Sequence, residues 1–216
     1  MSAMSTTYNG FPVLIHTDTA LSQLNLPTSR VSFNTGNDFS TIGKDWQKRD
    51  NVKRKYYNRQ VQQTYIISSA ADIADFTDFF TGRQGRYLPF FAPTFIFNYT
   101  SCETVASSAT LKVNQAGRDD FYSTYNVMRK DIIIFRDSLA DAGQYRKISS
   151  VAFGLDSDVS YDTLTLDSAV GANTKSLITD LIWCHFGSDE LKVSSIGGGR
   201  YKVSFTLIED QGDLAL

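Results

Sequence analysis

The side chains that most often do chemistry in proteins are few in this chain and far apart. The 216 residues include two histidines, His16 and His185, and two cysteines, Cys102 and Cys184. Neither histidine has a cysteine or glutamate at a metal-ligand spacing, and no serine nucleophile elbow is visible. His185 lies within an apolar run, which favours a hydrogen-bonded core histidine over a metal ligand. The cysteines are too few for a disulfide framework, so we expect two free thiols.

Aspartates supply the next candidates. Asp156, Asp158 and Asp162 are expected in a polar loop between strands, and Asp119 and Asp120 form a second acidic pair. Calcium needs about six to eight oxygen ligands, and the spacing does not follow an EF-hand loop. Turn-forming aspartates are therefore the preferred interpretation. We expect no catalytic residue, no cofactor site, no metal site and no enzymatic activity.

A basic stretch covers residues 44–59, where lysines and arginines outnumber the acids Asp45 and Asp50. Trp46, Tyr56 and Tyr57 are interleaved with the basic residues, as on some nucleic-acid-binding surfaces. A solvated loop that leads into an edge strand, or a protein interface, is the preferred interpretation, because lysines protect exposed sheet edges. The formal net charge of −2 gives the whole chain no electrostatic attraction to nucleic acid or to anionic membranes.

The composition is that of a folded protein, with 42% hydrophobic and 20% charged residues. The N-terminus has no basic and apolar leader, and no apolar run approaches the roughly 20 residues of a membrane span. We therefore expect neither a targeting segment nor a membrane partner.

The strongest local pattern is a helix predicted over residues 69–81. Ser69 and Asp72 have the spacing of a capping box, in which the hydroxyl and the carboxylate satisfy free amides of the first turn. An apolar stripe at helical spacing predicts one buried face. It consists of Ile73, Phe76, Phe79 and Phe80.

A turn rich in glycine and arginine follows this helix. Gly82 is expected to take the left-handed conformation, with Arg83 near the last helical carbonyls. Gly85 turns the chain a second time before an aromatic segment. Pro89 and Pro93 limit that segment to a sheet edge or a short strand.

The rest of the chain mostly predicts strands. They are expected over residues 57–67, 95–99, 131–135, 146–153, 163–167, 177–186 and 200–208. The three consecutive residues Ile132, Ile133 and Ile134 predict a strand buried on both faces, and glycines 197–199 predict a turn. Residues 1–55 are expected to be irregular, with one or two edge strands. One helix among many short strands predicts a mainly β protein, a β-barrel or sandwich with a single amphipathic helix and an inserted or second small β module.

Two segments resemble the belt domain of phage distal tail and minor tail proteins. The first contains the Phe79–Phe80 helix end, the turn at residues 82–86 and the aromatic strand at 90–93. The second is the run at residues 185–193 with the final strand that ends at Glu209. Together they cover about residues 55–100 and 180–210. The resemblance implies packing roles for Phe76, Phe79, Phe80, Gly82, Gly85, Phe90, Phe91 and Pro93.

The resemblance also implies an organisation and a function. Residues 1–100 would form the belt domain, residues 101–180 a second β module, and residues 181–216 the strands that complete the belt. Such proteins form a closed ring, expected to be a hexamer, that joins the tail tube to the tail-tip hub in the virion after assembly in the bacterial cytoplasm. DNA passes through the ring without specific binding, and the outer module contacts other tip proteins or a host-surface sugar.

Two points stay open at this stage. Arg83 and Arg86 either pair with acids of a neighbouring subunit or cap the helix and cover its aromatic surface. The alternative function is a carbohydrate-binding module that stacks sugars on exposed members of the 11 tyrosines and 2 tryptophans.

Overall fold

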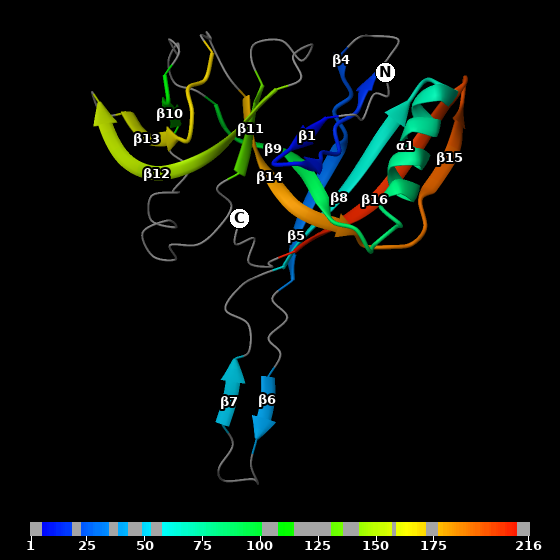
Figure 1. Cartoon of the computed structure of the whole chain (residues 1–216), viewed down its shortest axis with the longest axis horizontal. Helices are drawn as coiled ribbons and strands as arrows, with labels where there is room; N and C mark the ends of the chain where they lie inside the picture. Colours follow the sequence, from blue (N-terminus) through cyan, green and yellow to red (C-terminus); the bar gives the residue numbers. More distant parts are fainter. Residues whose placement is uncertain are drawn as a thin grey trace.

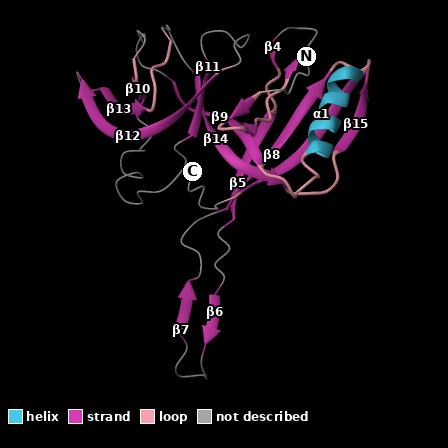
Figure 2. Ribbon diagram, viewed as in Figure 1, coloured by secondary structure: helices cyan, strands magenta, loops and turns pink. Residues whose placement is uncertain are grey.

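The computed structural model describes residues 6–18, 23–34, 39–42, 49–52, 58–100, 108–114, 131–135, 143–156, 159–171 and 177–210. Within these ranges the protein is mainly β, with a single α-helix and a large antiparallel sheet, as Figure 2 shows. The predicted mainly β class is thus confirmed.

The helix is α1 (Ala70–Gly82). The strands are β1 (Thr7–Tyr8), β2 (Phe11–Pro12), β3 (Thr17–Asp18), β4 (Gln23–Leu24), β5 (Thr28–Asn34), β6 (Phe39–Ile42), β7 (Arg49–Val52), β8 (Asn58–Ile67), β9 (Phe90–Thr100), β10 (Thr110–Asn114), β11 (Asp131–Phe135), β12 (Gln144–Asp156), β13 (Val159–Leu166), β14 (Leu177–Phe186), β15 (Lys192–Gly197) and β16 (Arg200–Glu209).

The main sheet has the strand order β10-β13-β12-β11-β14-β16-β8-β5, with β15 paired to β16 and β9 paired to β14. Strand β14 lies at its centre (Figure 1). Residues 177–180 of β14 pair with β11, residues 184–186 pair with β16, and β9 pairs along the opposite edge. The sheet therefore has two parts that share β14. We call β10 to β13 the outer part, and β5, β8, β9, β15, β16 and α1 the helix-covered part.

Two hydrophobic cores match these two parts. The larger core lies under α1 and includes Phe76, Phe90 and Phe186. The smaller core lies within the outer part. Strand β11 separates them, because Ile133 and Phe135 belong to the larger core and its alternate residues to the smaller one. The prediction of a strand buried on both faces is confirmed, while the three-segment division of the chain remains a prediction.

Helix α1 begins as predicted. The Ser69 hydroxyl oxygen accepts hydrogen bonds from the backbone N–H groups of Ala71 (3.1 Å) and Asp72 (3.3 Å). Its apolar stripe packs on the sheet: the Phe76 ring lies 4.9 Å from the Tyr65 ring, and the Phe80 ring lies 4.8 Å from that of Phe186. In Figure 1 the helix lies over β8 and β16, beside β15.

The prediction for Gly82 is wrong. Gly82 is the last residue of α1, and Arg83, with φ −91°, is the C-cap. The left-handed residues come later, at Gln84 (φ 52°) and Gly85 (φ 60°). The helix extends one residue further than expected, and the Gly85 N–H closes it by bonding to the Phe80 carbonyl at 3.2 Å.

Strand β9 is longer than predicted. It runs without a break from Phe90 to Thr100 and includes Pro93, where the sequence indicated a separate short strand at 95–99. Strand β9 pairs with β14 along one side, and its other side has a single bridge, between Phe91 and Val13, within the residues that the structure describes. Pro93 lies outside this bridge, so no ladder partner needs the missing N–H. Apart from the bridge, β9 has the edge position predicted from the prolines.

The N-terminal region holds more strands than the one or two that were expected. Residues Asn9 and Gly10 both have positive φ, 50° and 81°, and join β1 to β2 in a two-residue hairpin. Strand β5 pairs with β8 at the end of the main sheet. Strands β6 and β7 pair with each other and lie apart from the main sheet (Figure 1).

Candidate assembly surface

The structure brings together the two segments that resemble the belt domain. Strand β8 pairs with β16, and β9 pairs with β14. The turn after α1 meets the β14–β15 connection, where Arg86 Nε lies 3.2 Å from Asp189 Oδ2. The backbone N–H of Arg86 also donates to Asp189 Oδ1 at 3.3 Å. The two segments thus form one structural unit, although Arg86 and Asp189 are 103 positions apart.

Gly85 permits this contact. It is buried and has a left-handed φ of 60°, which side chains other than glycine rarely adopt. A Cβ atom at this position would lie 2.8 Å from Asp189 Oδ1 and 3.2 Å from Asp189 Cα. Both the conformation and the space therefore require glycine.

The two candidate arginines have different surroundings. The Arg86 side chain is 58% exposed and its partner Asp189 is 51% exposed, so this ion pair is worth less than about 1 kcal/mol in water. Arg83 caps the helix through its backbone N–H, which donates to the carbonyls of Phe79 (3.0 Å) and Phe80 (3.2 Å). The Arg83 Nε atom is buried without a hydrogen-bond partner in the structure. The Arg86 side chain is thus exposed to solvent, whereas Arg83 caps the helix with its backbone N–H and has a buried Nε.

The face of the sheet opposite α1 is polar. Along β8, Val61, Gln63, Tyr65 and Ile67 point into the core, so the alternate residues point outward. Cross-strand pairing places the following residues on this outward face: Thr28, Arg30, Gln62, Thr64, Ile66, Lys202, Ser204 and Thr206. The Thr64 and Ser204 hydroxyl oxygens are 3.1 Å apart and share a hydrogen bond. The face presents hydroxyls, amides, two cations and one exposed apolar side chain, Ile66.

The two end strands of the helix-covered part, β15 and β5, each pair with a neighbouring strand on one side only, within the residues that the structure describes. At one end β15 pairs with β16, and all six residues of β15 are exposed. At the other end β5 pairs with β8. Each end strand therefore has a row of backbone groups that faces away from its neighbour.

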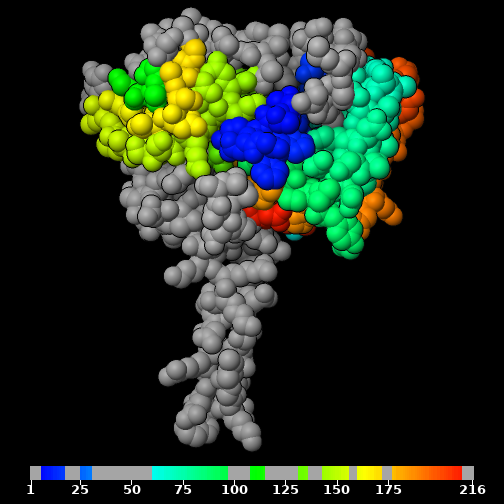
Figure 3. Space-filling view, viewed as in Figure 1, coloured from blue at the N-terminus to red at the C-terminus, as the bar shows by residue number. Residues whose placement is uncertain are grey.

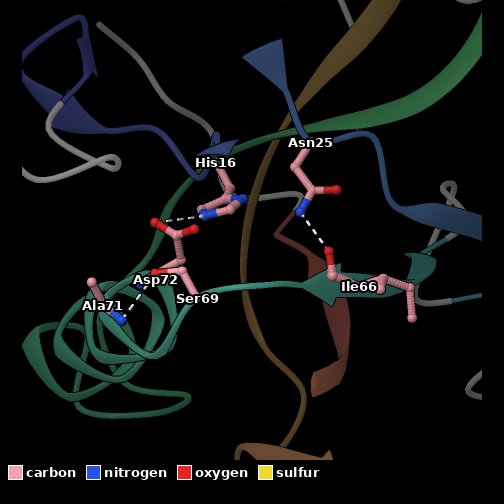
Figure 4. Close-up of polar contacts among 6 residues, drawn as sticks. All are labelled: His16, Asn25, Ile66, Ser69, Ala71 and Asp72. Atoms are coloured by element: carbon pink, nitrogen blue, oxygen red, sulfur yellow. Dashed lines mark hydrogen bonds and ion pairs between the residues drawn. The ribbon is translucent and has the colours of Figure 1, made fainter. Parts of the chain in front are cut away.

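His16 is a fully buried ionisable group to which the sequence analysis assigned no role. Both His16 and Asp72 are fully buried, and His16 Nε2 lies 3.8 Å from Asp72 Oδ1 (Figure 4). In the same view Asn25 Nδ2 donates to the Ile66 carbonyl at 2.8 Å. These contacts hold the N-terminal segment against the start of α1 and the end of β8. In the sequence, the only sign of these buried contacts is that a histidine directly follows the apolar residues 13–15.

The other predicted site residues are structural. His185 is hydrogen-bonded as expected, with Nδ1 2.7 Å from Asp210 Oδ1, although 25% of its side chain is exposed. Cys184 is buried and forms no disulfide, and its thiol donates to the Phe90 carbonyl at 3.6 Å. The loop prediction for Asp162 is wrong: it is buried inside β13, because the strand extends further toward the N-terminus than its pattern indicated. Asp156 is the last residue of β12.

Several predictions fall outside the described residues. They concern Asp119, Asp120, Asp158, Cys102 and, in the basic stretch, residues 43–48 and 53–57. Within the parts that the structure describes, no group of three or more His, Cys, Asp or Glu side chains is placed to hold a metal ion. The same parts contain no helix with the length and apolar character needed to cross a bilayer.

Comparisons of the sequence with models of known protein families and with curated protein sequences found no match. The arguments for function therefore come from the geometry.

Proposed function

We propose that this protein is a ring-forming structural subunit of a phage tail, an adaptor that joins the tail tube to the tail-tip hub and leaves a channel for DNA. The main support is that the two belt-like segments form one unit, joined by β8–β16 and β9–β14 pairing and by the Gly85 turn against Asp189. This unit has one strand at each end that is paired on one side only in the described part of the chain. The geometry suits repeated contact between identical copies.

Ring closure on this proposal is a heterologous contact. Strand β15 of one copy lies against β5 of the next, and the backbone groups that face away from each sheet form hydrogen bonds between subunits. The strands have similar lengths, six and seven residues, so their exposed edges are comparable in size. Because every copy offers both edges, the same contact repeats until the rotation closes the ring.

The outward face of the sheet fits the inner wall of such a ring. Its hydroxyl and amide groups hydrate readily, and Arg30 and Lys202 provide a weak positive potential. A wall with many cations would release many counterions on DNA binding and would hold the DNA tightly. A mostly neutral polar wall lets DNA slide.

The direct test is particle shape in negative-stain images and particle mass by mass photometry. We expect closed rings for the wild-type chain. Ile196→Lys, at a 51% exposed position of β15, places a hydrated cation at the proposed contact and should reduce rings to monomers. Ala74→Lys, on the exposed side of α1, is the matched control and should assemble normally. A wild-type chain that stays monomeric at high concentration, or rings that survive in Ile196→Lys, would contradict the proposal.

A carbohydrate-binding module is the second candidate function. Tyr87 is 69% exposed, and the Arg86 guanidinium carbon lies 5.9 Å from its ring centroid. An exposed ring beside charged groups is suited to stacking on a sugar whose hydroxyls bond to those charges. Glycan-array binding by a monomer, lost in Tyr87→Ala, would favour this function over the ring.

A further inference from the structure

The β1–β2 hairpin has a rigid, defined shape. Asn9 and Gly10 form its turn, and Tyr8 and Phe11 are directly paired across it. Directly opposed residues in an antiparallel pair project from the same face. The turn therefore holds two aromatic rings side by side on one face of the hairpin.

The two rings contact different parts of the sheet. The Phe11 ring lies 4.7 Å from Trp183 of β14. The Tyr8 ring lies 5.4 Å from Tyr145 of β12, in the outer part. Phe91 of β9 contacts both rings, with centroids 5.1 Å from Tyr8 and 6.5 Å from Phe11. The hairpin thus straddles Phe91 and reaches both parts.

A directional bond strengthens the contact with the outer part. The Tyr8 hydroxyl donates to Asp131 Oδ1 at 2.8 Å, and Asp131 is the first residue of β11. Asp131 pairs across the strands with Lys147 of β12. Tyr8 is therefore connected to both β11 and β12. Figure 3 shows the blue N-terminal residues between the yellow-green residues of these strands and the green residues that follow α1.

The hairpin lies where the sheet itself is irregular. The β9–β14 register shifts between Ile178 and Thr179 and again between Thr179 and Leu181. On β9, Phe95 has a positive φ of 51°. These irregularities occur where β14 passes from pairing with β11 to pairing with β16. A bulge interrupts the backbone ladder and lets the strand bend, so this junction is a weak point between the two parts.

We propose that the β1–β2 hairpin is a clip that fixes the orientation of the outer part relative to the helix-covered part. Backbone pairing along β14 joins the two parts but bends at the junction. The Tyr8 and Phe11 rings, with the Tyr8–Asp131 hydrogen bond, hold them at one angle. This inference does not depend on ring formation, because all its contacts lie within one chain.

Hydrogen–deuterium exchange of the full-length protein tests the clip. Tyr8→Phe keeps the ring and removes the hydroxyl. Gly10→Ala has no atom within 4 Å of the added Cβ, so it acts only by straining a residue with φ 81°. For both variants we expect roughly fivefold faster exchange in β11, in the start of β12 and at residues 177–181 of β14, with α1 and β8 unchanged. Thr7→Ala, at an exposed position of the same hairpin, is the matched control and should behave as wild type.

Three results would overturn the inference. The first is unchanged exchange in β11 and β12 in both variants. The second is an equal increase in α1 and β8, which would make the hairpin a general stabiliser. The third is an effect of Thr7→Ala as large as that of Tyr8→Phe.

Discussion

Gly82, the last residue of α1, and Gly85, in the turn that follows, differ in whether the structure requires glycine. Gly82 ends the helix with no atom within 4 Å of an added Cβ and with no positive φ. Gly85 has φ +60°, and an added Cβ would lie 2.8 Å from Asp189 Oδ1 and in tight contact, at 3.2 Å, with Asp189 Cα. The same residue type is thus dispensable at one position and required at the other, three residues along.

At the scale of single residues this contrast gives a paired prediction. Gly82→Ala should leave the free energy of unfolding unchanged or raise it by up to about 1 kcal/mol, because alanine favours helix. Gly85→Ala should lower it by about 1–3 kcal/mol, because the backbone is strained and the Asp189 turn must move. Urea unfolding followed by circular dichroism measures both. Equal effects of the two substitutions would contradict the assignment of the left-handed turn to Gly85.

At the scale of elements, the Arg86–Asp189 pair connects the turn after α1 to the β14–β15 connection. Arg86→Glu places two carboxylates together at this contact and removes the solvent-facing cation. We expect the monomer to stay folded, because the pair is exposed and weak. We also expect ring closure to be impaired in negative-stain images.

Asp189→Asn provides the matched comparison. The asparagine oxygen can still accept from the Arg86 N–H, so the turn is kept and Arg86 retains its charge. Normal rings in Asp189→Asn with few rings in Arg86→Glu would support a contact between subunits. Normal rings in Arg86→Glu would remove Arg86 from the interface.

The elements also show what the sequence alone can predict. Helix α1 and strands β8, β14 and β16 follow from local periodicity and capping, and the structure confirms them. The β1–β2 hairpin was missed because two-residue strands are too short for a periodic pattern. Its Asn9–Gly10 turn was nevertheless a recognisable hairpin signal. Pro93 suggested a break in β9, but Pro93 pairs with β14 only and lies outside the Val13–Phe91 bridge, so its missing N–H costs no ladder bond.

The candidate assembly surface was less predictable, because it depends on contacts between distant positions. Arg86 was identified from its place in the turn, yet its partner Asp189 lies in another segment and has no local signature. That β5 and β15 each pair on one side only follows from the order of strands in the sheet. The hydrophobic periodicity of a segment does not reveal that order. The exposed residues of β15 show no alternation that would reveal its position.

At the scale of the whole molecule, the larger core buries Tyr65 fully, and the partly buried Tyr8 and Tyr145 pack against it from other elements. Burial raises the pKa of Tyr65 on β8, of Tyr145 on β12 and of Tyr8 on β1 well above the ordinary value. For Tyr8, the hydrogen bond to Asp131 raises the pKa further. All three tyrosines pack on the larger core, so ionising any of them in the folded state means placing a charge there.

These pKa shifts predict a loss of stability in alkali. In the unfolded chain the phenols ionise near pH 10, whereas in the folded chain they stay protonated to higher pH. Above about pH 10 the unfolded state therefore binds fewer protons, and stability falls by up to about 1.4 kcal/mol per pH unit for the fully buried Tyr65. The fall is smaller for the partly buried Tyr8 and Tyr145, because water partly stabilises their ionised forms. Below about pH 10 the phenols are protonated in both the folded and the unfolded state, so their contribution to stability does not depend on pH. Urea unfolding at several pH values, with tyrosinate absorbance as a second probe, measures the slope.

Tyr65→Phe removes the contribution of the Tyr65 phenol to this loss of stability in alkali. Among the residues that the structure describes, the Tyr65 hydroxyl makes only a long 3.4 Å hydrogen bond to Gln63, so the variant keeps the packed ring and should fold. Because Tyr65 is fully buried and Tyr8 and Tyr145 are only partly buried, the alkaline slope should fall by about a third or more while stability at pH 7 changes little. A slope equal to that of wild type would mean that Tyr65 ionises equally in the folded and unfolded states. It would then have to be accessible to solvent, which contradicts its complete burial between α1 and the sheet.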